Sequence, residues 1–115
     1  MREQVPQLAV LIVRFRPKPA LATEFRQHLF RVIEHMKLEG AFVTTIAHES
    51  TDNPGELVLY EMWRGTKEDF IAEQLTREYR KPYMDIRDSM LDGFSAEWLI
   101  PVNEWGSAFM ENVST

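Results

Sequence analysis

The sequence predicts an α+β fold, in which one antiparallel sheet carries helices on a single face. The main observation is the order of apolar patterns along the chain, which runs strand, helix, strand, strand, helix, strand. The length of 115 residues is a second observation, because it suits one compact domain. The third is composition: 44% hydrophobic and 27% charged residues are typical of a globular domain and not of a disordered chain.

Prolines separate the first strand from the first helix. Residues 7–15 are rich in Val, Ile and Leu, which predicts a strand. Pro17 ends this strand because proline lacks the N–H of the ladder, and Pro19 suits the first turn of a helix. Residues 19–39 then repeat an apolar side chain every three or four positions, which predicts a helix ending at Gly40. The repeated positions are Leu21, Phe25, Leu29, Val32 and Met36.

The next two strands flank a polar turn. Residues 41–49 and 57–64 are predicted as strands, and the Pro-Gly-containing segment 50–55 is predicted as the turn between them. Thr66 is expected to cap the following helix, with Asp69 three positions later as a form of the capping box. These signals place a hairpin and then a helix in the middle of the chain.

The second helical region precedes the last strand. Phe70, Ile71 and Leu75 form its predicted buried side, and Pro82 is expected to divide it into two helices. The second helix continues an apolar stripe at Tyr79, Tyr83, Ile86 and Met90. Asp92-Gly93 is expected to end it, before a fourth strand at residues 94–102.

These elements form a single domain over residues 7–102. Residues 1–6 are expected to be a flexible N-terminus, and residues 103–115 a tail that contains Trp105 and Phe109. Right-handed crossovers convert the element order into a ferredoxin-like sheet of strand order 4-1-3-2. The two central strands of that order, residues 7–15 and 57–64, are also the two most apolar.

The central strands are apolar on both faces. In residues 57–64, Leu57, Leu59 and Trp63 lie on one face, and Val58, Tyr60 and Met62 lie on the other. Helices cover only one face, and large exposed apolar patches are unusual on monomers. We therefore expect a homodimer packed sheet against sheet, with the tail reaching the partner subunit. The alternative is that the tail folds back over its own domain.

Charge and cysteine content exclude several classes of protein. The net charge of −5 and the isoelectric point near 5.2 argue against nucleic-acid binding. The sequence has no cysteine, which excludes disulfides and thiolate metal sites and fits a reducing, cytoplasmic location. The longest aliphatic run, residues 8–13, is far shorter than the ~20 residues that span a bilayer, so we expect no membrane partner.

Glu61 and Trp63 are the leading candidates for chemistry. They lie two residues apart, and so on one face of a predicted strand. A buried Glu61 would have a raised pKa and could serve as a general base. Arg14 is the charged side chain of the neighbouring apolar strand, and we expect it to pair with Glu61. The alternative reading is a structural ion pair between these two residues, with Trp63 as part of the core.

Aromatic residues predict a pocket between sheet and helices. Tyr79 and Tyr83 are four apart, and with Trp63 and Phe70 they would line a cavity for a flat, mostly apolar ligand. The alternative is an ordinary aromatic core. His28, His35 and His48 lack the close spacing of metal ligands, so no metal site is expected, while His48 is expected at the pocket mouth. A local basic cluster is predicted to be a solvated helix face: Arg77, Arg80, Lys81 and Arg87.

The chain resembles the antibiotic biosynthesis monooxygenase family of dimeric α+β barrel proteins. The resemblance rests on residues 10–19, on residues 57–64 with their Tyr-Glu-x-Trp pattern, and on Phe70, Thr76, Tyr79 and Tyr83 in the later helices. It covers roughly residues 7–102. It implies oxidation of a quinol or polycyclic phenol by O2 without a cofactor: the phenol is deprotonated, its anion reduces O2, and a peroxy intermediate collapses to a quinone.

The resemblance also suggests roles for individual residues. Trp63 matches the tryptophan associated with the site, and Glu61, Arg14 and Tyr83 are its expected polar partners. Polyketide-oxidising members carry an asparagine where this chain has Leu59. Haem-degrading members use an asparagine in the first strand and a histidine in the later helix. This chain has Val13, and no histidine in its later helix, so we expect no haem binding.

Two other functions remain open at this level. One is a non-oxidative isomerase on the same fold, in which Glu61 or His48 abstracts a proton from a small oxygenated substrate. The other is a non-catalytic, ligand-binding dimer. That reading expects Glu61 to be locked in an ion pair with Arg14 and no cavity to remain between helices and sheet.

Overall fold

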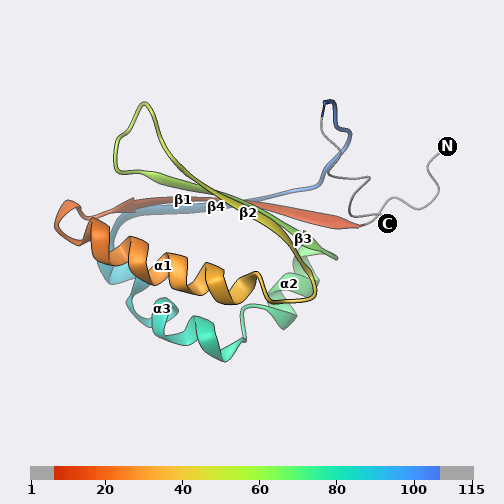
Figure 1. The fold of residues 1–115 in the computed structure, drawn as a ribbon, viewed down its shortest axis with the longest axis horizontal. Coiled ribbons are helices and arrows are strands. Elements are labelled where there is room, and N and C mark those ends of the chain that lie inside the picture. Colours follow the sequence, from red (N-terminus) through yellow and green to blue (C-terminus); the bar gives the residue numbers. More distant parts are fainter. Residues whose placement is uncertain (1–6, 107–115) are drawn as a thin grey trace.

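The computed structural model describes residues 7–106, and in it one four-stranded antiparallel sheet carries its helices on a single face (Figure 1). This is the predicted ferredoxin-like α+β fold. The expectations for residues 1–6 and for Phe109 fall outside the described residues. None of the helices within residues 7–106 has the length and apolar character needed to cross a membrane.

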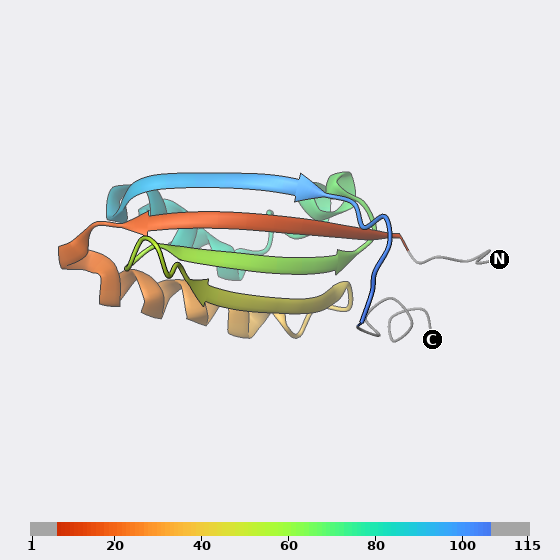
Figure 2. The same ribbon diagram turned by 90° about the horizontal axis from the view of Figure 1, so that it is seen from above.

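The sheet has the predicted strand order. Its strands are β1 (Leu8–Pro17), β2 (Phe42–Glu49), β3 (Leu57–Arg64) and β4 (Leu91–Leu99). They lie in the order β2-β3-β1-β4, so the two most apolar strands are central (Figure 2). Leu11 lies opposite Glu61 in the register between β1 and β3. This pairing sets which side chains of the two central strands share a face.

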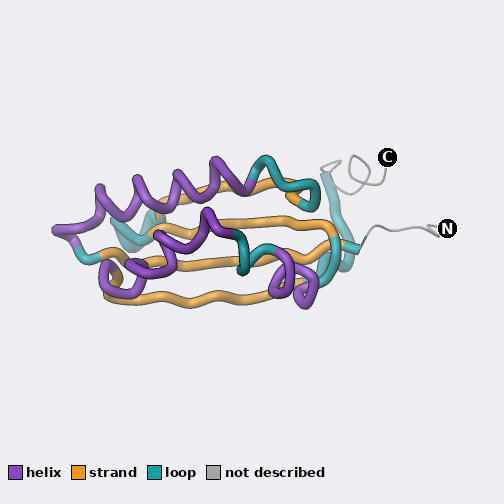
Figure 3. Tube along the Cα trace, turned by 90° about the horizontal axis from the view of Figure 1, so that it is seen from below, coloured by secondary structure: helices purple, strands orange, loops and turns teal. Residues whose placement is uncertain are grey.

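The helical layer consists of one long helix and several short segments (Figure 3). Helix α1 (Ala22–Met36) follows a 3-10 turn, η1 (Pro19–Leu21). Beyond β3 come α2 (Lys67–Glu73), η2 (Glu78–Arg80), α3 (Lys81–Ile86) and η3 (Arg87–Met90). The capping box before α2 is confirmed: the Asp69 N–H donates to Thr66 Oγ1 at 3.0 Å, and the Thr66 N–H donates to Asp69 Oδ2 at 3.0 Å.

Two predicted boundaries were wrong. Asp92-Gly93 does not end a helix, because β4 already begins at Leu91 and ends at Leu99. Gly93 pairs with Arg16 beside an irregularity in the register between β1 and β4, and a Cβ there would lie 3.3 Å from Arg16 Cζ. The absence of a side chain at Gly93 therefore lets the Arg16 side chain lie close to β4. The later helices do divide in two, but Pro82 lies in the first turn of α3 and not between them.

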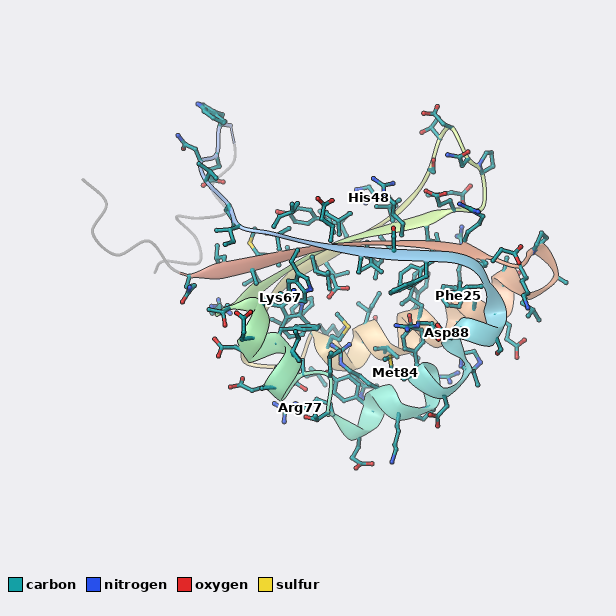
Figure 4. All side chains as sticks on the ribbon, turned by 180° about the vertical axis from the view of Figure 1, so that it is seen from behind. Phe25, His48, Lys67, Arg77, Met84 and Asp88 are labelled. Carbon is teal, nitrogen blue, oxygen red and sulfur yellow. The ribbon has the colours of Figure 1, made fainter. Side chains whose placement is uncertain are left out.

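The main core lies between the sheet and the helices. From α1 it takes Phe25, Leu29, Val32 and Met36, four of the five predicted stripe positions, while Leu21 is partly buried against it. From the strands it takes the side chains that point toward the helices: Leu11, Val13, Phe15, Leu57, Leu59 and Trp63. Figure 4 shows Phe25 in this layer.

A second apolar cluster lies on the outer face of the sheet, opposite the helices. Leu8, Val10 and Met62 form its buried part, and Ile12, Val43 and Tyr60 pack against them. The chain after β4 also leaves on this outer side (Figure 1). The Tyr60 pKa is raised by burial and by the nearby Glu104 carboxylate, so this segment approaches its own sheet. Trp105 is 83% exposed.

Candidate active site

A cavity of about 250 Å³ lies between the sheet and the helical layer. Its wall is mainly apolar and includes Leu59 and Phe70, two of the predicted pocket residues. Four side chains add polar groups to the wall: Glu61, Arg80, Tyr83 and Arg87. A mostly apolar concave site with a few convergent polar groups is typical of a small-molecule site.

Glu61 lines the cavity, whereas Trp63, which was predicted to line it, lies in the core beside Glu61 and is not among the lining residues. The two residues lie on the same face of β3 because strand side chains alternate with a period of two. The Trp63 Nε1–H donates to Glu61 Oε1 at 3.0 Å, and both side chains are buried. Burial raises the pKa of the Glu61 carboxyl, while the Trp63 hydrogen bond and the positive charge of Arg80 partly oppose that rise. Glu61 is therefore more basic than an exposed glutamate, which suits a general base.

Aromatic neighbours hold Trp63 in place. Its ring is perpendicular to that of Phe42, with centroids 5.3 Å apart, and makes an edge contact with Phe70 at 5.1 Å. Phe70 in turn contacts Trp98 of β4 at 5.1 Å. Edge-to-face contacts at these distances are favourable and directional. The indole N–H is thus aimed at Glu61 by direct packing from β2 and α2, while β4 supports Phe70.

Arg80 is a site residue that the sequence reading missed. It was assigned to a solvated helix face, but it is 7% exposed and lines the cavity. Its Nε and Nη2 form no hydrogen bond with any residue in the described part of the chain. The guanidinium carbon lies 5.2 Å from the Phe70 ring centroid and 5.8 Å from that of Tyr79.

Helical spacing could have located Arg80. It is three residues before Tyr83, and Arg87 is four residues after Tyr83, so the three lie on one helical face. Tyr83 was correctly predicted to lie on the apolar stripe of its helix, and all three residues line the cavity. The pattern that indicates a buried Arg80 is a basic residue at helical spacing from a buried aromatic residue.

The two predicted tyrosines have different surroundings. Tyr83 lines the cavity, and burial raises its pKa far above 10.0, so its hydroxyl stays protonated. Tyr79 is not among the cavity-lining residues. Its ring stacks on His35 of α1 with centroids 5.0 Å apart, and burial raises its pKa against the opposing charge of Arg80. Tyr79 therefore contacts Arg80 but does not itself line the cavity.

Arg14 and His48 lie on the other face of the sheet, away from the cavity. Arg14 is three residues from Leu11, the partner of Glu61, and an odd separation reverses the face. The predicted Arg14–Glu61 pair was wrong: Arg14 Nη1 lies 3.7 Å from Glu56 Oε1. His48 lies opposite Val58, with Nδ1 3.1 Å from the Val58 carbonyl oxygen (Figure 4).

These placements remove the features expected of the non-catalytic dimer. Glu61 is not locked in an ion pair with Arg14, and a cavity does remain between helices and sheet. Within residues 7–106, no three His, Asp or Glu side chains are grouped so that they could hold a metal ion. The polar chemistry of the cavity thus rests on one carboxyl, one phenol and two guanidinium groups.

Comparison with known proteins agrees with this architecture. The sequence model of the antibiotic biosynthesis monooxygenase family matches residues 8–81. The structure of Rv0793 from Mycobacterium tuberculosis has a TM-score of 0.76 at 25% identity, over 86% of this chain and 99% of that one. No curated protein matches the sequence.

Two further structures share the fold at lower identity. A candidate antibiotic biosynthesis monooxygenase from Caulobacter crescentus CB15 has a TM-score of 0.75 at 17% identity, over 86% of this chain and 93% of that one. PA3566 from Pseudomonas aeruginosa has a TM-score of 0.76 at 13% identity, over 87% of this chain and 99% of that one.

Proposed function

Because this chain belongs to the antibiotic biosynthesis monooxygenase family, we propose that it oxidises a quinol or small polycyclic phenol with O2 and without a bound cofactor. The observation that supports this most is the buried Glu61 carboxyl, with its raised pKa, in the wall of an apolar cavity. A carboxyl of this kind, in a mainly apolar cavity, can act as a general base.

The first step is deprotonation of the substrate. The hydroxyl donates its proton to Glu61, and the Trp63 N–H keeps the receiving carboxylate oriented. The phenolate that forms is electron-rich, and the positive charges of Arg80 and Arg87 in the cavity wall stabilise it. This is the part of the reaction to which the protein contributes most directly.

The remaining steps use the substrate's own electrons. The phenolate transfers one electron to O2, and the two radicals combine into a carbon-bound peroxide. Loss of the proton on that carbon breaks the O–O bond, leaves a carbonyl and releases the second oxygen atom as water. The substrate loses four electrons and O2 gains four, so no other reductant is required.

The size of the cavity limits the substrate. Its volume of about 250 Å³ is below the roughly 300–1,000 Å³ typical of drug-sized ligands. The aromatic walls formed by Phe70 and Trp98 suit a flat ring system. We therefore favour substrates of one or two fused rings within the proposed class.

Oxygen consumption tests the proposal. Purified protein should consume ¹⁸O2 with benzene or naphthalene hydroquinols, and mass spectrometry should find one atom of ¹⁸O in the product. Anthrones, which have three fused rings, complete the panel and test the size limit. Glu61→Gln should lower kcat by roughly 10²–10⁴-fold, the usual contribution of a general base. A Leu38→Asp variant, changed at an exposed loop position, is the matched control.

The outcomes separate the alternatives. No oxygen uptake with any compound, or rates unaffected by Glu61→Gln, would refute the monooxygenase. Exchange of substrate C–H protons with deuterated water, without oxygen uptake, would instead favour the isomerase.

We also propose that the outer sheet face packs against a second copy of the chain. The support is that Ile46 and Leu99 of that face are both more than 40% exposed in a single chain, although they border an apolar cluster whose members Leu8, Val10 and Met62 are already buried. Apolar area of this kind is stabilised by burial in a symmetric interface. Sedimentation should give about 27 kDa, twice the 13.5 kDa of one chain.

Ile46→Asp tests this interface directly. In a single chain Ile46 is 43% exposed, so the substitution should leave the monomer folded but dissociate a dimer. Leu38→Asp, at a position that is 78% exposed and on the helical side, should leave the dimer intact. A wild-type protein that sediments at 13.5 kDa would refute the proposed interface.

A further inference from the structure

Arg80 carries a buried charge, and part of its hydrogen-bonding capacity is unused among the described residues. Its side chain is more than nine-tenths buried, yet Nε and Nη2 have no hydrogen-bond partner among the described residues. A buried arginine is ordinarily paired, because burying an unpaired charge is costly. The aromatic rings of Phe70 and Tyr79 partly stabilise the guanidinium, and the Tyr79 hydroxyl is a weak, uncharged acceptor beside it.

No acidic side chain is paired with Arg80. Glu61 is close enough for the Arg80 charge to influence it, but its recorded hydrogen bond is to Trp63, and no ion pair joins Glu61 to Arg80. Glu39, on the other side of Tyr79, pairs with Arg77 at 3.1 Å. The second guanidinium of the wall differs in this respect, because Arg87 Nε already lies 3.0 Å from Asp88 Oδ1. Arg80 is thus the cation of the wall that lacks a partner.

We propose that Arg80 binds a carboxylate carried by the substrate, so that the ligand of this cavity is an aromatic hydroxy acid. The edge of the guanidinium that carries Nε and Nη2 matches the two oxygens of a carboxylate, and it meets a ligand when the side chain turns this edge toward the cavity. Phe70 lies under the guanidinium and also lines the cavity, so an aromatic ring beside Phe70 would present its carboxylate to Arg80. The hydroxyl would then be directed toward Glu61.

Binding of the acid would also prepare the base. A carboxylate paired with Arg80 offsets the charge that now holds down the pKa of Glu61, and Arg87 is then the main cation that stabilises the phenolate. The Glu61 carboxylate then becomes a stronger base when the substrate is present. The expected hydroxyl group of the ligand rests on the proposed function, whereas the expected carboxylate rests on Arg80 alone. The two expectations can therefore be tested separately.

A pair of ligands that cannot be oxidised in this way tests the carboxylate site. We would measure the binding of 2-naphthoate and of 2-naphthamide by calorimetry at pH 7.5; the two have nearly the same shape and differ in charge. The wild-type protein should bind 2-naphthoate at least tenfold more tightly, a difference of about 1.4 kcal/mol per tenfold. Equal affinities, or no binding of either compound, would overturn the proposal.

Variants assign the effect to one arginine. Arg80→Gln should abolish the preference for the carboxylate, whereas Arg80→Lys should keep part of it as a point charge. Arg77→Gln is the matched control, because Arg77 belongs to the same segment but is half-exposed, pairs with Glu39 and does not line the cavity (Figure 4). A preference that survives Arg80→Gln, or is lost in Arg77→Gln, would contradict the assignment.

The comparison remains decisive if Arg80→Gln does not fold, because the two ligands and Arg80→Lys still measure the preference. Failure of the proposed function gives a different pattern. A protein that binds 2-naphthoate through Arg80 but consumes no O2 with any hydroquinol would retain the anion site and lose the monooxygenase activity.

Discussion

Replacing Trp63 by Phe removes the hydrogen bond that Glu61 accepts and keeps most of the aromatic packing. Trp63 is 1% exposed, and its Nε1 lies 3.0 Å from Glu61 Oε1. Hydrogen bonds to charged groups contribute about 1.5–3 kcal/mol. The lost ring atoms add roughly 1–2 kcal/mol of apolar burial. The free energy of unfolding should therefore fall by about 2.5–5 kcal/mol at neutral pH, out of the roughly 5–15 kcal/mol typical of a domain.

The loss should depend on pH. The Trp63 hydrogen bond lowers the pKa of Glu61, so its removal raises that pKa further. Once the carboxyl is protonated, the missing bond is a neutral one and matters less. Urea unfolding should thus show a larger loss at pH 7.5 than at pH 4.5, provided both proteins are native at each pH. The pH–rate profile of the variant should shift to higher pH.

Trp98→Phe is the control for this experiment. Trp98 contacts Phe70 as Trp63 does, but it lines the cavity and no hydrogen bond joins it to Glu61. Its replacement should lower stability by the packing contribution alone, with no dependence on pH. If Trp63→Phe and Trp98→Phe lose the same stability at both pH values, Glu61 does not depend on the indole N–H and the reasoning is wrong.

Three other predictions concern single residues. Glu61→Gln should raise stability at neutral pH, because burial raises the folded-state pKa of Glu61 and the ionised form is then disfavoured in the folded protein. This gain should vanish as pH falls through that raised pKa toward 4.5, the ordinary value, as urea unfolding at several pH values would show. The kcat of the wild-type enzyme should increase with pH through an apparent pKa above 4.5, and a profile that is flat from pH 5 to 9 would contradict Glu61 as the base. Thr66→Ala removes the acceptor of the Asp69 N–H and should cost about 0.5–2 kcal/mol, while Thr66→Ser should restore most of it; equal stability of all three proteins would argue against the cap.

Periodicity predicted the elements because each depends on local rules. The α1 stripe from Phe25 to Met36 follows the helical period, and Glu61 and Trp63 share a face because strand side chains alternate. The Thr66–Asp69 capping box involves residues three apart. Such relations are visible in a sequence since the interacting groups are close along the chain.

Strand register and helix orientation cannot be predicted from such local rules. Arg14 was expected beside Glu61 because their strands are neighbours, but an offset of three residues from Leu11 places it on the outer face, next to Glu56. Gly93 resembled a helix stop and instead lies against Arg16 in the sheet. In both cases the deciding contact joins residues that are far apart in the sequence.

The sequence by itself determined the order of elements, the central position of the two most apolar strands and the pairing of Glu61 with Trp63 on one face. Only the tertiary structure decided that Arg80 lines the cavity while Arg14 and His48 lie on the other face of the sheet. A charged side chain in the sequence reads as solvent-exposed, because burial is costly unless a partner is present. Whether such a partner or a ligand stands opposite depends on how the helices pack on the sheet, and that packing is a property of the whole fold.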